Sequence, residues 1–519
     1  MKLVTVTQMR AIEREADAAG LSYSQMMENA GRGLAEIVHS LGNENGWDSV
    51  MGVVGSGNNG GDTLVALSWL AEAGWRTHAY LVNRKTADDL LIVRYLESGG
   101  ELTQFSADTG RESLLPFLEG SDILLDGLLG TGFKLPLKNE AALFLRETSL
   151  ILQKLEDPPF VIAVDCPSGV DCDTGACADE TLRADLTITM AAVKQGLLKF
   201  PAYEHIGNLE LVDIDLPDGL ASWKIMDADV ADPKLAARLL PERNPASHKG
   251  TFGTALVTAG SISYSGAALL AGKAACKVGT GLVTMAVPEP LHNALAGHLP
   301  EATWIILPHE HGFISEGAAY HVSDGLERAT AILIGPGFGS KHTTKLFIEH
   351  LLPSLELPAV FDADGLRHLA SIPGWHEKIK RTAVLTPHPG EMSAMTGLSR
   401  AAIQSNREEI AGKYANEWGH VVVLKGAFTV IAAPDGRKTI IPVATPALAH
   451  AGTGDVLAGI IVGLLAQGLK AYESAVAGAY IHAQAGLRAA DLLGTTASVL
   501  AGDVLDCVSD VIAELEEFT

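Results

Sequence analysis

One stretch near the C-terminus decides the fold class of its half of the chain: Ala451-Gly452-Thr453-Gly454-Asp455-Val456-Leu457-Ala458-Gly459-Ile460-Ile461-Val462-Gly463-Leu464-Leu465-Ala466. Small residues come first and apolar residues at helical spacing follow, which predicts a helix that begins near Asp455. The first N–H groups of a helix carry the positive end of its dipole, so they form an anion site. That field favours the ionised form of Asp455, which can accept a proton beside a bound phosphate. The stretch therefore indicates phosphoryl transfer to a hydroxyl, with a glycine turn capped by an aspartate as the alternative.

Length, composition and charge limit what the chain can be. The 519 residues, 47% of them hydrophobic and 19% charged, predict a globular protein of two or more domains. The 38 basic and 62 acidic residues give a formal net charge of −24. Because binding to nucleic acid or to an anionic membrane depends on clustered basic side chains, we expect neither as a partner.

The cysteines and the N-terminus bear on location. Cys166, Cys172 and Cys177 lie close together without CxxC spacing or a nearby pair of histidines. That pattern argues against zinc and against a disulfide framework, and it fits a reducing compartment. The N-terminus lacks the apolar core of a signal peptide, and no stretch of membrane-spanning length is free of polar residues. We therefore expect a soluble, cytoplasmic protein.

A glycine-rich segment also marks the N-terminal half. A strand over residues 50–54 leads into Gly55-Ser56-Gly57-Asn58-Asn59-Gly60-Gly61-Asp62, and a helix is expected over residues 63–73. The loop matches G-x-G-x-x-G, but the next strand ends in Asn83-Arg84-Lys85 instead of the acidic residue that contacts the ribose of NAD. We therefore do not expect a standard dinucleotide-cofactor site. The polar side chains of the loop indicate recognition of a polar ring or oxygen ligation of a cation.

Two further strands of this half end in carboxylates. Asp126 ends the strand that begins at residue 123, and Asp165 ends the strand that begins at residue 160. Ligands of parallel α/β sheets bind at the carboxyl ends of the strands, so both aspartates are expected beside the glycine loop. Asn59, Asp126 and Ser168 offer only oxygen donors, which suit K⁺ or Mg²⁺ better than zinc. Lys194, after the strand over residues 186–190, is a candidate for the same rim.

An irregular stretch separates the two halves. Proline and glycine interrupt residues 216–247, so we predict domains at 1–218 and 246–519 with a linker at 219–245. The second half again alternates strands and helices, and a hairpin around Pro434-Asp435-Gly436 predicts that not every strand is parallel. The expected strands before the hairpin are 254–258, 282–287, 331–334, 359–361, 383–385 and 421–424.

Two single residues of the second half admit both a structural and a functional interpretation. His388 stands between two prolines, which alone indicates a turn histidine. Lys425 follows a strand, where it can contact a phosphate or reach solvent. Because the helix that begins near Asp455 is expected at the same edge of the sheet, the functional interpretation gains weight for both residues.

In combination these motifs resemble two known families. Residues 57–62, 126–132 and 165–169 are similar to the NAD(P)HX epimerase family. Residues 248–250, 335–337, 386–391, 425–429 and 452–455 are similar to the ADP-dependent NAD(P)HX dehydratase family. The resemblance covers nearly the whole chain, and the order of the two halves is that of the bacterial bifunctional NAD(P)H-hydrate repair enzymes. It implies an α/β protein in which a Rossmann-like three-layer domain precedes a ribokinase-like domain.

The resemblance implies that the N-terminal domain interconverts the R and S epimers of hydrated NAD(P)H. It places the substrate on Asn58, Asn59, Gly60, Gly61 and Asp62, and on Gly130, Thr131, Gly132, Phe133, Lys134, Leu135 and Pro136. It matches Asn59, Asp126 and Ser168 to potassium ligands, and Asp165 to a residue that contacts the substrate. We predict Asp165 as the acid/base and Lys194 as its helper.

For the C-terminal domain the resemblance implies dehydration of the S epimer at the expense of ADP, with Mg²⁺, giving NAD(P)H, AMP and phosphate. Hydroxide leaves poorly, whereas a phosphorylated hydroxyl leaves when the ring nitrogen supplies its lone pair, and Asp455 would take the hydroxyl proton. The nucleotide is expected on Lys425, Gly426, Ala427, Phe428, Thr429 and Gly454, and the hydrated dinucleotide on Ala267, Gly337, His388 and Asp455. We expect a homo-oligomer of undetermined size.

Three positions depart from the family pattern. Thr63 follows Asp62 where the family usually has Gly, Cys166 replaces an aliphatic residue, and Ala451 stands where Gly is common. Thr63 adds bulk at a helix start and could narrow the substrate site.

Two alternatives stay open at this point. The C-terminal half could be a ribokinase-like kinase of a small molecule such as a vitamin precursor, with the N-terminal half as a binding or regulatory domain. Alternatively, the N-terminal half could be a non-catalytic interaction domain, as suspected for lipoprotein-binding relatives.

Overall fold

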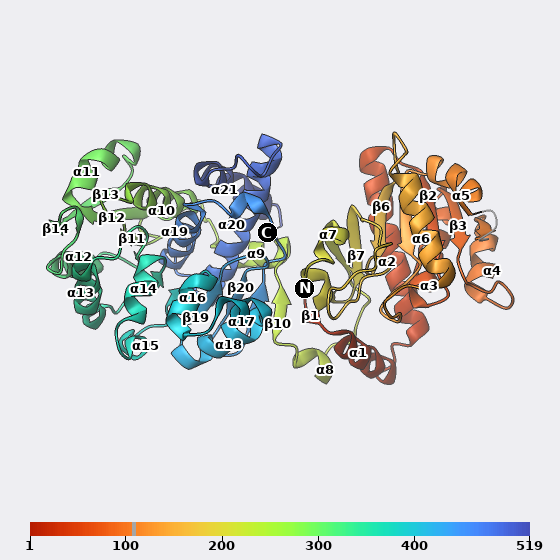
Figure 1. Ribbon diagram of the computed structural model, residues 1–519, viewed down its shortest axis with the longest axis horizontal. Coiled ribbons are helices and arrows are strands. Elements are labelled where there is room, and N and C mark those ends of the chain that lie inside the picture. The colour runs from red at the N-terminus through yellow and green to blue at the C-terminus, as the bar shows by residue number, and fades with distance from the viewer. Residues whose placement is uncertain (106–109, 519) are drawn as a thin grey trace. The chain divides into compact units, whose positions relative to one another are not determined.

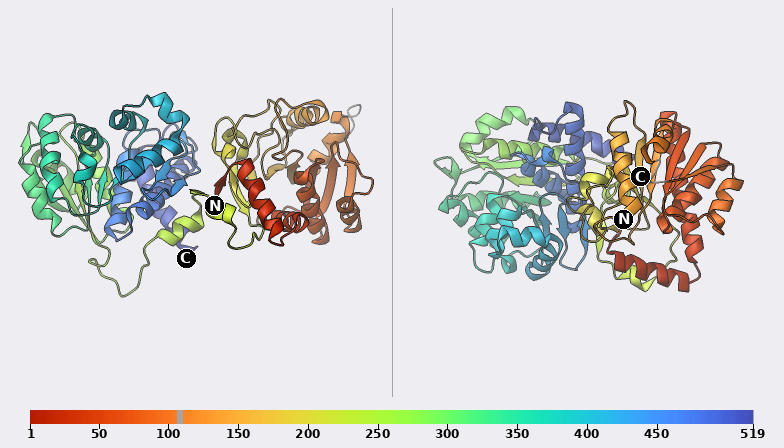
Figure 2. Two further views of the ribbon diagram at one scale, coloured as in Figure 1. Left: turned by 90° about the horizontal axis from the view of Figure 1, so that it is seen from below. Right: turned by 45° about the vertical axis from the view of Figure 1, so that its right-hand side comes forward.

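The computed structural model describes residues 1–105 and 110–518, and it divides into two compact units, Met1–Met226 and Asp227–Thr519 (Figure 1). Each unit has one large sheet with helices on both sides (Figures 1 and 2). In both main sheets, the strands beside a candidate site end in polar loops. The two sheets therefore determine where the candidate sites lie.

The first unit has a seven-stranded parallel sheet. Its order is β4-β3-β2-β5-β6-β7-β9, which places β2, the strand that leads into the glycine motif, beside the central strand β5. The strands are β2 (Ser49–Val54), β3 (Arg76–Leu81), β4 (Glu101–Gln104), β5 (Ile123–Gly127), β6 (Phe160–Val164), β7 (Leu186–Met190) and β9 (Asn208–Val212). A separate short pair, β1 (Leu3–Val4) and β8 (Val193–Lys194), fixes the backbone of Lys194 against Val4.

Helices cover both faces of this sheet, which gives the three layers predicted from the sequence. Alternate residues of each central strand face opposite sides, and both sides are apolar, so two cores form. One core receives α1 (Val6–Ala18), α2 (Tyr23–Asn45), α3 (Asn58–Glu72) and α4 (Leu90–Glu97), and the other receives α5 (Gly110–Glu119) and α6 (Asn139–Leu152). The short helices are α7 (Tyr203–Ile206), α8 (Ala221–Lys224) and the 3₁₀ turn η1 (Gln195–Leu198).

The second unit has a ten-stranded sheet of mixed direction. Its order is β10-β21-β20-β19-β18-β17-β16-β11-β12-β13, and the predicted hairpin β20–β21 supplies its antiparallel part. The strands are β10 (Ala228–Val230), β11 (Thr254–Thr258), β12 (Leu282–Pro288), β13 (Thr303–Leu307), β16 (Ala331–Ile334), β17 (Ala359–Phe361), β18 (Val384–Leu385), β19 (Val421–Leu424), β20 (Val430–Ala432) and β21 (Lys438–Ile440). A small hairpin of β14 (His309–Glu310) and β15 (Phe313–Ile314) stands apart from this sheet.

Helices again lie on both faces. The core on one face receives α9 (Pro233–Leu239), α10 (Ser265–Lys277), α19 (Thr453–Ala466), α20 (Ala471–Leu493) and α21 (Ala501–Glu516). Leu256 points the other way and meets Gly325 of α12 (Ala318–Leu326). The remaining helices are α11 (Glu289–Leu295), α13 (His342–Leu351), α14 (Asp364–Ala370), α15 (Trp375–Lys378), α16 (Pro389–Thr396), α17 (Arg400–Ser405) and α18 (Arg407–Trp418), with 3₁₀ turns η2 (Ala296–His298), η3 (Leu352–Ser354) and η4 (Pro446–Leu448).

The stretch at residues 451–466 forms α19, the central helix of this core. Its glycines let α10 approach closely, because a Cβ on Gly459 would lie 2.3 Å from the carbonyl oxygen of Ala271. Gly463 meets Val278 and Thr280 in the same way. This close packing fixes the N-terminal end of α19, where Asp455 lies.

The predicted linker at residues 219–245 is wrong for most of its length. The boundary between the units lies between Met226 and Asp227, and the second unit takes β10 and α9 from the predicted linker. A three-residue strand followed by Asp232 and Pro233 is too short to show a hydrophobic period. Its pairing with β21 supplies the order that the local sequence does not reveal.

None of the helices in the described part of the chain combines the length and the apolar character needed to cross a membrane.

Candidate active sites

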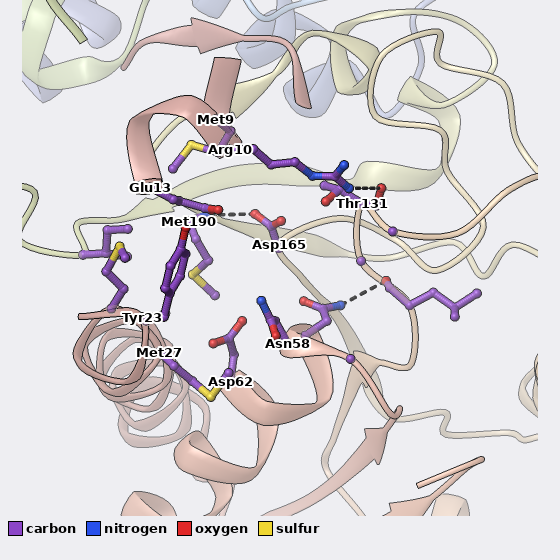
Figure 3. A pocket seen from close by; sticks show the side chains of 18 of the residues that line it. Met9, Arg10, Glu13, Tyr23, Met27, Asn58, Asp62, Thr131, Asp165 and Met190 are labelled. Atoms are coloured by element: carbon purple, nitrogen blue, oxygen red, sulfur yellow. Dashed lines mark hydrogen bonds between the residues drawn. The ribbon is translucent and has the colours of Figure 1, made fainter. Parts of the chain in front are cut away.

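The first unit contains a cavity of about 840 Å³ beyond the carboxyl ends of β2, β5 and β6 (Figure 3). Its walls include side chains from α1 and α2 that the motifs did not reveal, among them Glu13, Tyr23 and Met27. The predicted residues that line it are Asn58, Asn59, Asp62, Gly130, Thr131, Gly132, Phe133, Asp165 and Lys194. The predicted residues outside its lining are Gly60, Gly61, Lys134, Leu135 and Pro136.

The glycine segment forms the start of α3 rather than a free loop. The helix begins at Asn58 after the N-cap Gly57, so the prediction of a helix from residue 63 was five residues late. Gly60 allows the helix to approach the end of β2, because a Cβ there would lie 2.1 Å from the carbonyl oxygen of Gly55. Asn58, Asn59 and Asp62 therefore project from a rigid helix into or beside the cavity.

Asp165 and Lys194 form a buried ion pair at the cavity wall. Asp165 has a positive φ of 63°, and its Oδ1 accepts hydrogen bonds from Lys194 Nζ, from Thr189 Oγ1 at 3.1 Å and from Met190 N at 3.0 Å. Lys194 also donates to the carbonyl oxygen of Met190 at 3.0 Å. Burial alone would lower the pKa of Lys194, but the charge of Asp165 raises that pKa above its usual value. The pair and the two further hydrogen bonds therefore fix the carboxylate in place.

Two more carboxyl groups face the cavity, and neither has a hydrogen-bond or ion-pair partner among the described residues. Burial, and next the charge of Asp165, raise the pKa of Asp62 well above its usual value. Burial also raises the pKa of Glu13, although Lys194 and Arg10 oppose that rise. The cavity thus combines one fixed carboxylate with two carboxyl groups whose pKa values are raised by burial.

The predicted cation ligands lie together beneath the cavity. Ser168 Oγ donates to Asp126 Oδ1 at 2.6 Å, and Ser168 N donates to Asp126 Oδ2 at 2.8 Å. Asn59 Nδ2 donates to the carbonyl oxygen of Leu129 at 3.0 Å, and the N–H of Leu129 donates to Ser168 Oγ at 2.8 Å. Asp126 is 1% exposed, and burial raises its pKa. The structure therefore brings the three side chains into one oxygen-rich cluster.

The two departures in this half do not face the cavity. Thr63 is fully buried, and its hydroxyl donates to the carbonyl oxygen of Asn59 at 2.8 Å. A Cβ on Gly127 would lie 1.8 Å from Thr63 Oγ1, so that glycine makes room for the threonine. Cys166 is buried against Cys172, and their hydrogen bond and burial raise the pKa of Cys166. The expectation that Thr63 narrows the site is therefore not met.

In the second unit, Asp455 lies in the first turn of α19. The helix begins at Thr453 after Gly452, whose φ is 93°. Burial raises the pKa of Asp455 to about 7, with a further rise from the charge of Asp362 that Lys425 partly offsets. We predicted that the helix dipole would favour the ionised form, and this is wrong because burial has the larger effect. A pKa near neutrality suits a group that accepts a proton during catalysis.

Lys425 links Asp455 to a carboxylate that the motifs did not single out. Lys425 Nζ lies 2.6 Å from Asp362 Oδ1, which also accepts from Thr386 Oγ1 at 2.6 Å. Asp362 is 1% exposed, and its second oxygen, Oδ2, is buried without a hydrogen-bond partner. Burial would lower the pKa of Lys425, but the charges of Asp362 and Glu391 raise it. A Cβ on Gly454 would lie 3.4 Å from Lys425 Nζ, so the lysine reaches the start of α19.

His388 is the N-cap of α16 and also faces this network. Its Nδ1 accepts hydrogen bonds from Gly390 N at 2.9 Å and Glu391 N at 3.3 Å. Its Nε2 lies 3.3 Å from Glu391 Oε1, and the other carboxylate oxygen of Glu391, Oε2, lies 4.0 Å from Lys425 Nζ. Burial, and then the charge of Lys425, lower the pKa of His388, so the ring is neutral with its proton on Nε2. The structural and functional interpretations of His388 therefore do not exclude each other.

The remaining predicted residues fall into two groups. Gly337 has a φ of 67°, and a Cβ on it would lie 2.9 Å from Cβ of Ala267, so these two residues are neighbours. Residues 425–429 form a tight turn after β19, in which Gly426 and Phe428 have positive φ values and Thr429 Oγ1 donates to the carbonyl oxygen of Gly426 at 3.0 Å. Lys425 N and Phe428 N donate to the carbonyl oxygens of Pro387 and Val443 at 2.9 and 3.0 Å, which fixes this turn in place.

Sequence reasoning missed Glu13, Asp362 and Glu391 as site residues. Asp362 follows a buried strand just as Asp165 does, so the same signal was available for it. Glu391 lies within a motif that was recognised, three residues after His388. Glu13 lies on an amphipathic helix far from any glycine loop, and only the packing of α1 brings it to the cavity.

Comparison with known proteins identifies both halves. Residues 23–196 match the family described as YjeF-related protein N-terminus, and residues 255–508 match the family described as NAD(P)H-hydrate dehydratase. The solved ADP/ATP-dependent NAD(P)H-hydrate dehydratase of Bacillus subtilis is 33% identical, with a TM-score of 0.48, and the match covers 56% of this chain and 100% of that one.

Full-length relatives show the same pairing of domains. The bifunctional NAD(P)H-hydrate repair enzyme Nnr of Moorella thermoacetica is 37% identical over 100% of this chain and 98% of its own length. The enzyme of the same name from Escherichia coli is 32% identical over 96% of this chain and 94% of its own length. On this evidence the chain belongs to the family of bifunctional NAD(P)H-hydrate repair enzymes.

Proposed function

We propose that this protein restores hydrated nicotinamide nucleotides, with one step of the repair in each unit. The first unit interconverts the R and S epimers of NAD(P)HX. The second unit removes water from the S epimer by phosphoryl transfer from ADP, which gives NAD(P)H, AMP and phosphate. Family membership over the full chain supports this pairing of activities. The observation that carries the proposal is that each unit has its own buried site with a lysine and several carboxyl groups.

In the first site, Asp165 is the group that accepts and returns the proton of the ring hydroxyl. Lys194, Thr189 and Met190 together fix the position of its Oδ1. The substrate lies against the start of α3 and the segment at residues 130–136, part of which lines the cavity. A cavity of about 840 Å³ is large enough for a nicotinamide ring with its ribose and phosphates.

The oxygen cluster beneath that cavity fits a potassium ion. Asn59, Asp126 and Ser168 would hold it, because a hard cation prefers carboxylate, amide and hydroxyl oxygens. A bound cation would stabilise the charge of the buried Asp126 and the adjoining cavity wall. The chain's own part is to keep Asn59, Leu129 and Ser168 in one hydrogen-bonded group.

In the second site, Asp455 takes the proton from the hydroxyl of the S epimer as that oxygen accepts the phosphoryl group. The lone pair of the ring nitrogen then expels phosphate, and loss of a proton from the adjacent carbon completes NAD(P)H. Residues 425–429 and Gly454 hold the nucleotide, while Ala267, Gly337 and His388 contact the hydrated dinucleotide. The positive φ values at Gly426 and Phe428 and the start of α19 support phosphate binding there.

The same site fits the magnesium ion that accompanies a nucleotide. Asp362 Oδ2 is buried and lacks a hydrogen-bond partner, and Mg²⁺ is commonly held by one or two carboxylates together with phosphate oxygens. When bound, Mg²⁺ would neutralise phosphate charge during the transfer. Asp362 would hold it, while Lys425 and Thr386 keep that carboxylate in place.

A coupled assay tests the proposal. Hydrated NADH as a mixture of both epimers is incubated with the protein, ADP and Mg²⁺, and the absorbance of NADH is followed. We expect complete conversion to NADH, because the first site converts the R epimer to the S epimer that the second site consumes. Conversion that stops when the S epimer is exhausted would overturn the epimerase assignment. No return of NADH with either ADP or ATP would overturn the dehydratase assignment.

The two alternatives give different results in the same assay. A vitamin-precursor kinase would phosphorylate an added alcohol substrate without returning NADH. If the first unit is non-catalytic, the R epimer would convert to the S epimer only at the uncatalysed rate. Asp165→Asn would then leave that rate unchanged. Running the assay with ADP and ATP in parallel also identifies the phosphoryl donor.

We further propose a cytoplasmic location and a homo-oligomeric state of undetermined size. The five cysteines are all free, which supports a reducing compartment. Light scattering of the purified protein measures the oligomeric state.

A further inference from the structure

Asp62 has an unusual position in the first site. It lies in the second turn of α3, and its carboxyl points into the cavity, whereas Asp165 enters from the loop after β6 (Figure 3). The two carboxyl groups therefore belong to different walls of one cavity. Asp165 is held by Lys194, Thr189 and Met190, whereas Asp62 has no hydrogen-bond or ion-pair partner among the described residues.

The surroundings of Asp62 explain why the pKa of its carboxyl is raised. Tyr23 and Met27 of α2 lie beside it (Figure 3), and Gly61 gives the Met27 side chain its space. The charged groups that act on Asp62 are Asp165, Lys194 and Glu13. Burial and the negative charge of Asp165 together raise the pKa of Asp62 more than Lys194 lowers it.

We propose that Asp62 is a second catalytic residue of the first site, the acid that complements Asp165 as the base. The inference rests on the proposed epimerase function of this unit. Two carboxyl groups in one cavity divide the roles of acid and base when their surroundings differ in this way. The hydrated ring presents a hydroxyl and a nitrogen on the same carbon, and opening the ring between that carbon and the nitrogen needs both roles at once.

The reaction that these two groups support is reversible ring opening. Asp165 takes the hydroxyl proton, the carbon–oxygen bond becomes a carbonyl, and the bond from that carbon to the ring nitrogen breaks. The electron pair goes to the nitrogen, which takes the proton of Asp62. Rotation about the adjacent carbon–carbon bond turns the other face of the aldehyde toward the nitrogen. Closure runs the same steps backward: the nitrogen returns its proton to Asp62, the oxygen takes back the proton held by Asp165, and the hydroxyl is inverted.

Glu13 is the competing candidate, because it also faces the cavity without a partner. It lies on the same side of the cavity as Asp165 (Figure 3), and Lys194 is the charge that acts on it most strongly. Asp62 instead lies on the other wall from Asp165 (Figure 3), so these two carboxyl groups can approach the hydroxyl and the nitrogen of that carbon from different sides.

The test measures epimerisation alone. The parent protein carries Asp455→Asn, which prevents removal of the S epimer, and conversion of pure R epimer to S is followed by chromatography. Asp62→Asn in this parent is expected to lower kcat by about 100-fold, the usual contribution of one positioned acid, with KM within about threefold. Glu13→Gln, the matched control, is expected to lose less than about tenfold. A kcat of Asp62→Asn equal to that of the parent, or a larger loss in Glu13→Gln, would overturn the proposal.

Two further readouts separate chemistry from structure. The parent's rate is expected to fall on the alkaline side as Asp62 loses its proton, and this fall should vanish in Asp62→Asn. In water labelled with oxygen-18 the hydroxyl oxygen is expected to be retained, whereas incorporation in each turnover would show loss of water and overturn ring opening. If Asp62→Asn unfolds, Asp62→Glu decides: it keeps an acidic proton and should retain at least about a tenth of the parent's kcat, and an inactive, folded Asp62→Glu overturns the proposal.

Failure of the proposed function gives a different result. If the parent itself does not accelerate epimerisation beyond buffer, the epimerase assignment is wrong whatever Asp62 does. If the parent is active and Asp62→Asn is equally active, only the role of Asp62 is wrong.

Discussion

The two sites use the same kinds of residue in opposite arrangements. In the first unit, the lysine pairs with the aspartate that we propose as the base, so Lys194 holds Asp165 directly. In the second unit, the lysine pairs with a different aspartate, so Lys425 holds Asp362 and leaves Asp455 without a hydrogen-bonded cation. The two sites therefore differ in which carboxyl group forms the ion pair with the lysine.

That difference separates the chemistry of the two bases. A carboxylate held by a buried lysine and two further donors keeps one position, which suits a base that must be ready on each turnover. Asp455 instead has a pKa of about 7, so it gains and loses its proton near neutrality. A base that takes up a proton and must release it again benefits from that value. Lys425 remains available beside Gly454, at the start of α19.

The largest expected effect comes from removing the base of the second site alone. Asp455→Asn should lower the rate of ADP-dependent dehydration by about 1,000-fold, because a positioned general base contributes on the order of 100- to 10,000-fold. The first site lies in the other unit, so R-to-S epimerisation should stay within about twofold of wild type. Separate assays of the two steps check this, and a parallel loss of epimerisation would mean that the two sites are not independent.

Removing each lysine tests the pairing itself. Lys194→Met leaves Asp165 with two neutral donors, and Lys425→Met leaves the buried Asp362 with the Thr386 hydroxyl. Breaking a buried pair by removing one partner costs about 3–5 kcal/mol in free energy of unfolding. We expect Lys194→Met to lower epimerisation by about 100-fold and to leave dehydration of the S epimer unaffected, and Lys425→Met to do the reverse.

Urea unfolding with the two activity assays measures both effects. Lys194→Arg is the control, because it keeps the positive charge but does not fit the site of Nζ. Its loss of epimerisation should be smaller than that of Lys194→Met. If both lysine variants lost the same activity, the comparison between the sites would fail.

The pKa of Asp455 predicts opposite effects of pH on activity and on stability. Dehydration should rise as pH passes through about 7, because the ionised carboxylate is the form that we propose as the base. The raised pKa means that the folded state favours the protonated carboxyl, so its contribution to stability is full below the unfolded value of 3.8 and is lost as pH rises through about 7. Because one pH unit of raised pKa corresponds to about 1.4 kcal/mol, Asp455→Asn should be more stable than wild type by at most about 4 kcal/mol above that pH.

Thermal melting of the nucleotide-free protein between about pH 4 and pH 8 checks this expectation. The gain in melting temperature of Asp455→Asn should be small near the unfolded pKa of 3.8, grow as pH rises toward about 7 and change little above that pH. An equal gain near pH 4 would attribute it to packing rather than to the carboxyl charge.

The sequence revealed the two sheets and most strand ends because their signals are local. Runs such as residues 50–54 and 331–334 are apolar, and the glycines that follow mark the end of each strand. The carboxyl ends of parallel strands meet at one edge, so Asp126, Asp165 and Ser168 could be placed together in advance. The predictions from sequence were wrong where a long-range contact determines the structure. The three residues of β10, for example, form a strand only by pairing with β21.

The electrostatics of the sites was less accessible from the sequence. The dipole of α19 was evident from the pattern, but the burial of Asp455 and the charge of Asp362 act in the opposite direction and have the larger effect. Glu13 and Asp62 have no hydrogen-bond or ion-pair partners among the described residues, and no local sequence pattern predicts the absence of a partner. Burial and pairing across the fold, rather than residue type, decide which carboxyl group in each site is ionised.

The smallest expected effect concerns Thr63, the residue after Asp62 that departs from the family pattern. Its hydroxyl bonds the carbonyl oxygen of Asn59 and its methyl group lies near Gly52, so the side chain supports α3 from behind and does not line the cavity. Thr63→Ser keeps the hydrogen bond and loses one buried methyl group, which should cost about 1 kcal/mol of stability. KM and kcat for epimerisation should stay within about twofold.

In the second site, Gly454→Ala is the matched change before Asp455, and its Cβ would lie 3.4 Å from Lys425 Nζ. We expect Gly454→Ala to raise KM for ADP several-fold. A larger change in KM for Thr63→Ser than for Gly454→Ala would contradict the conclusion that Thr63 lies outside the substrate cavity.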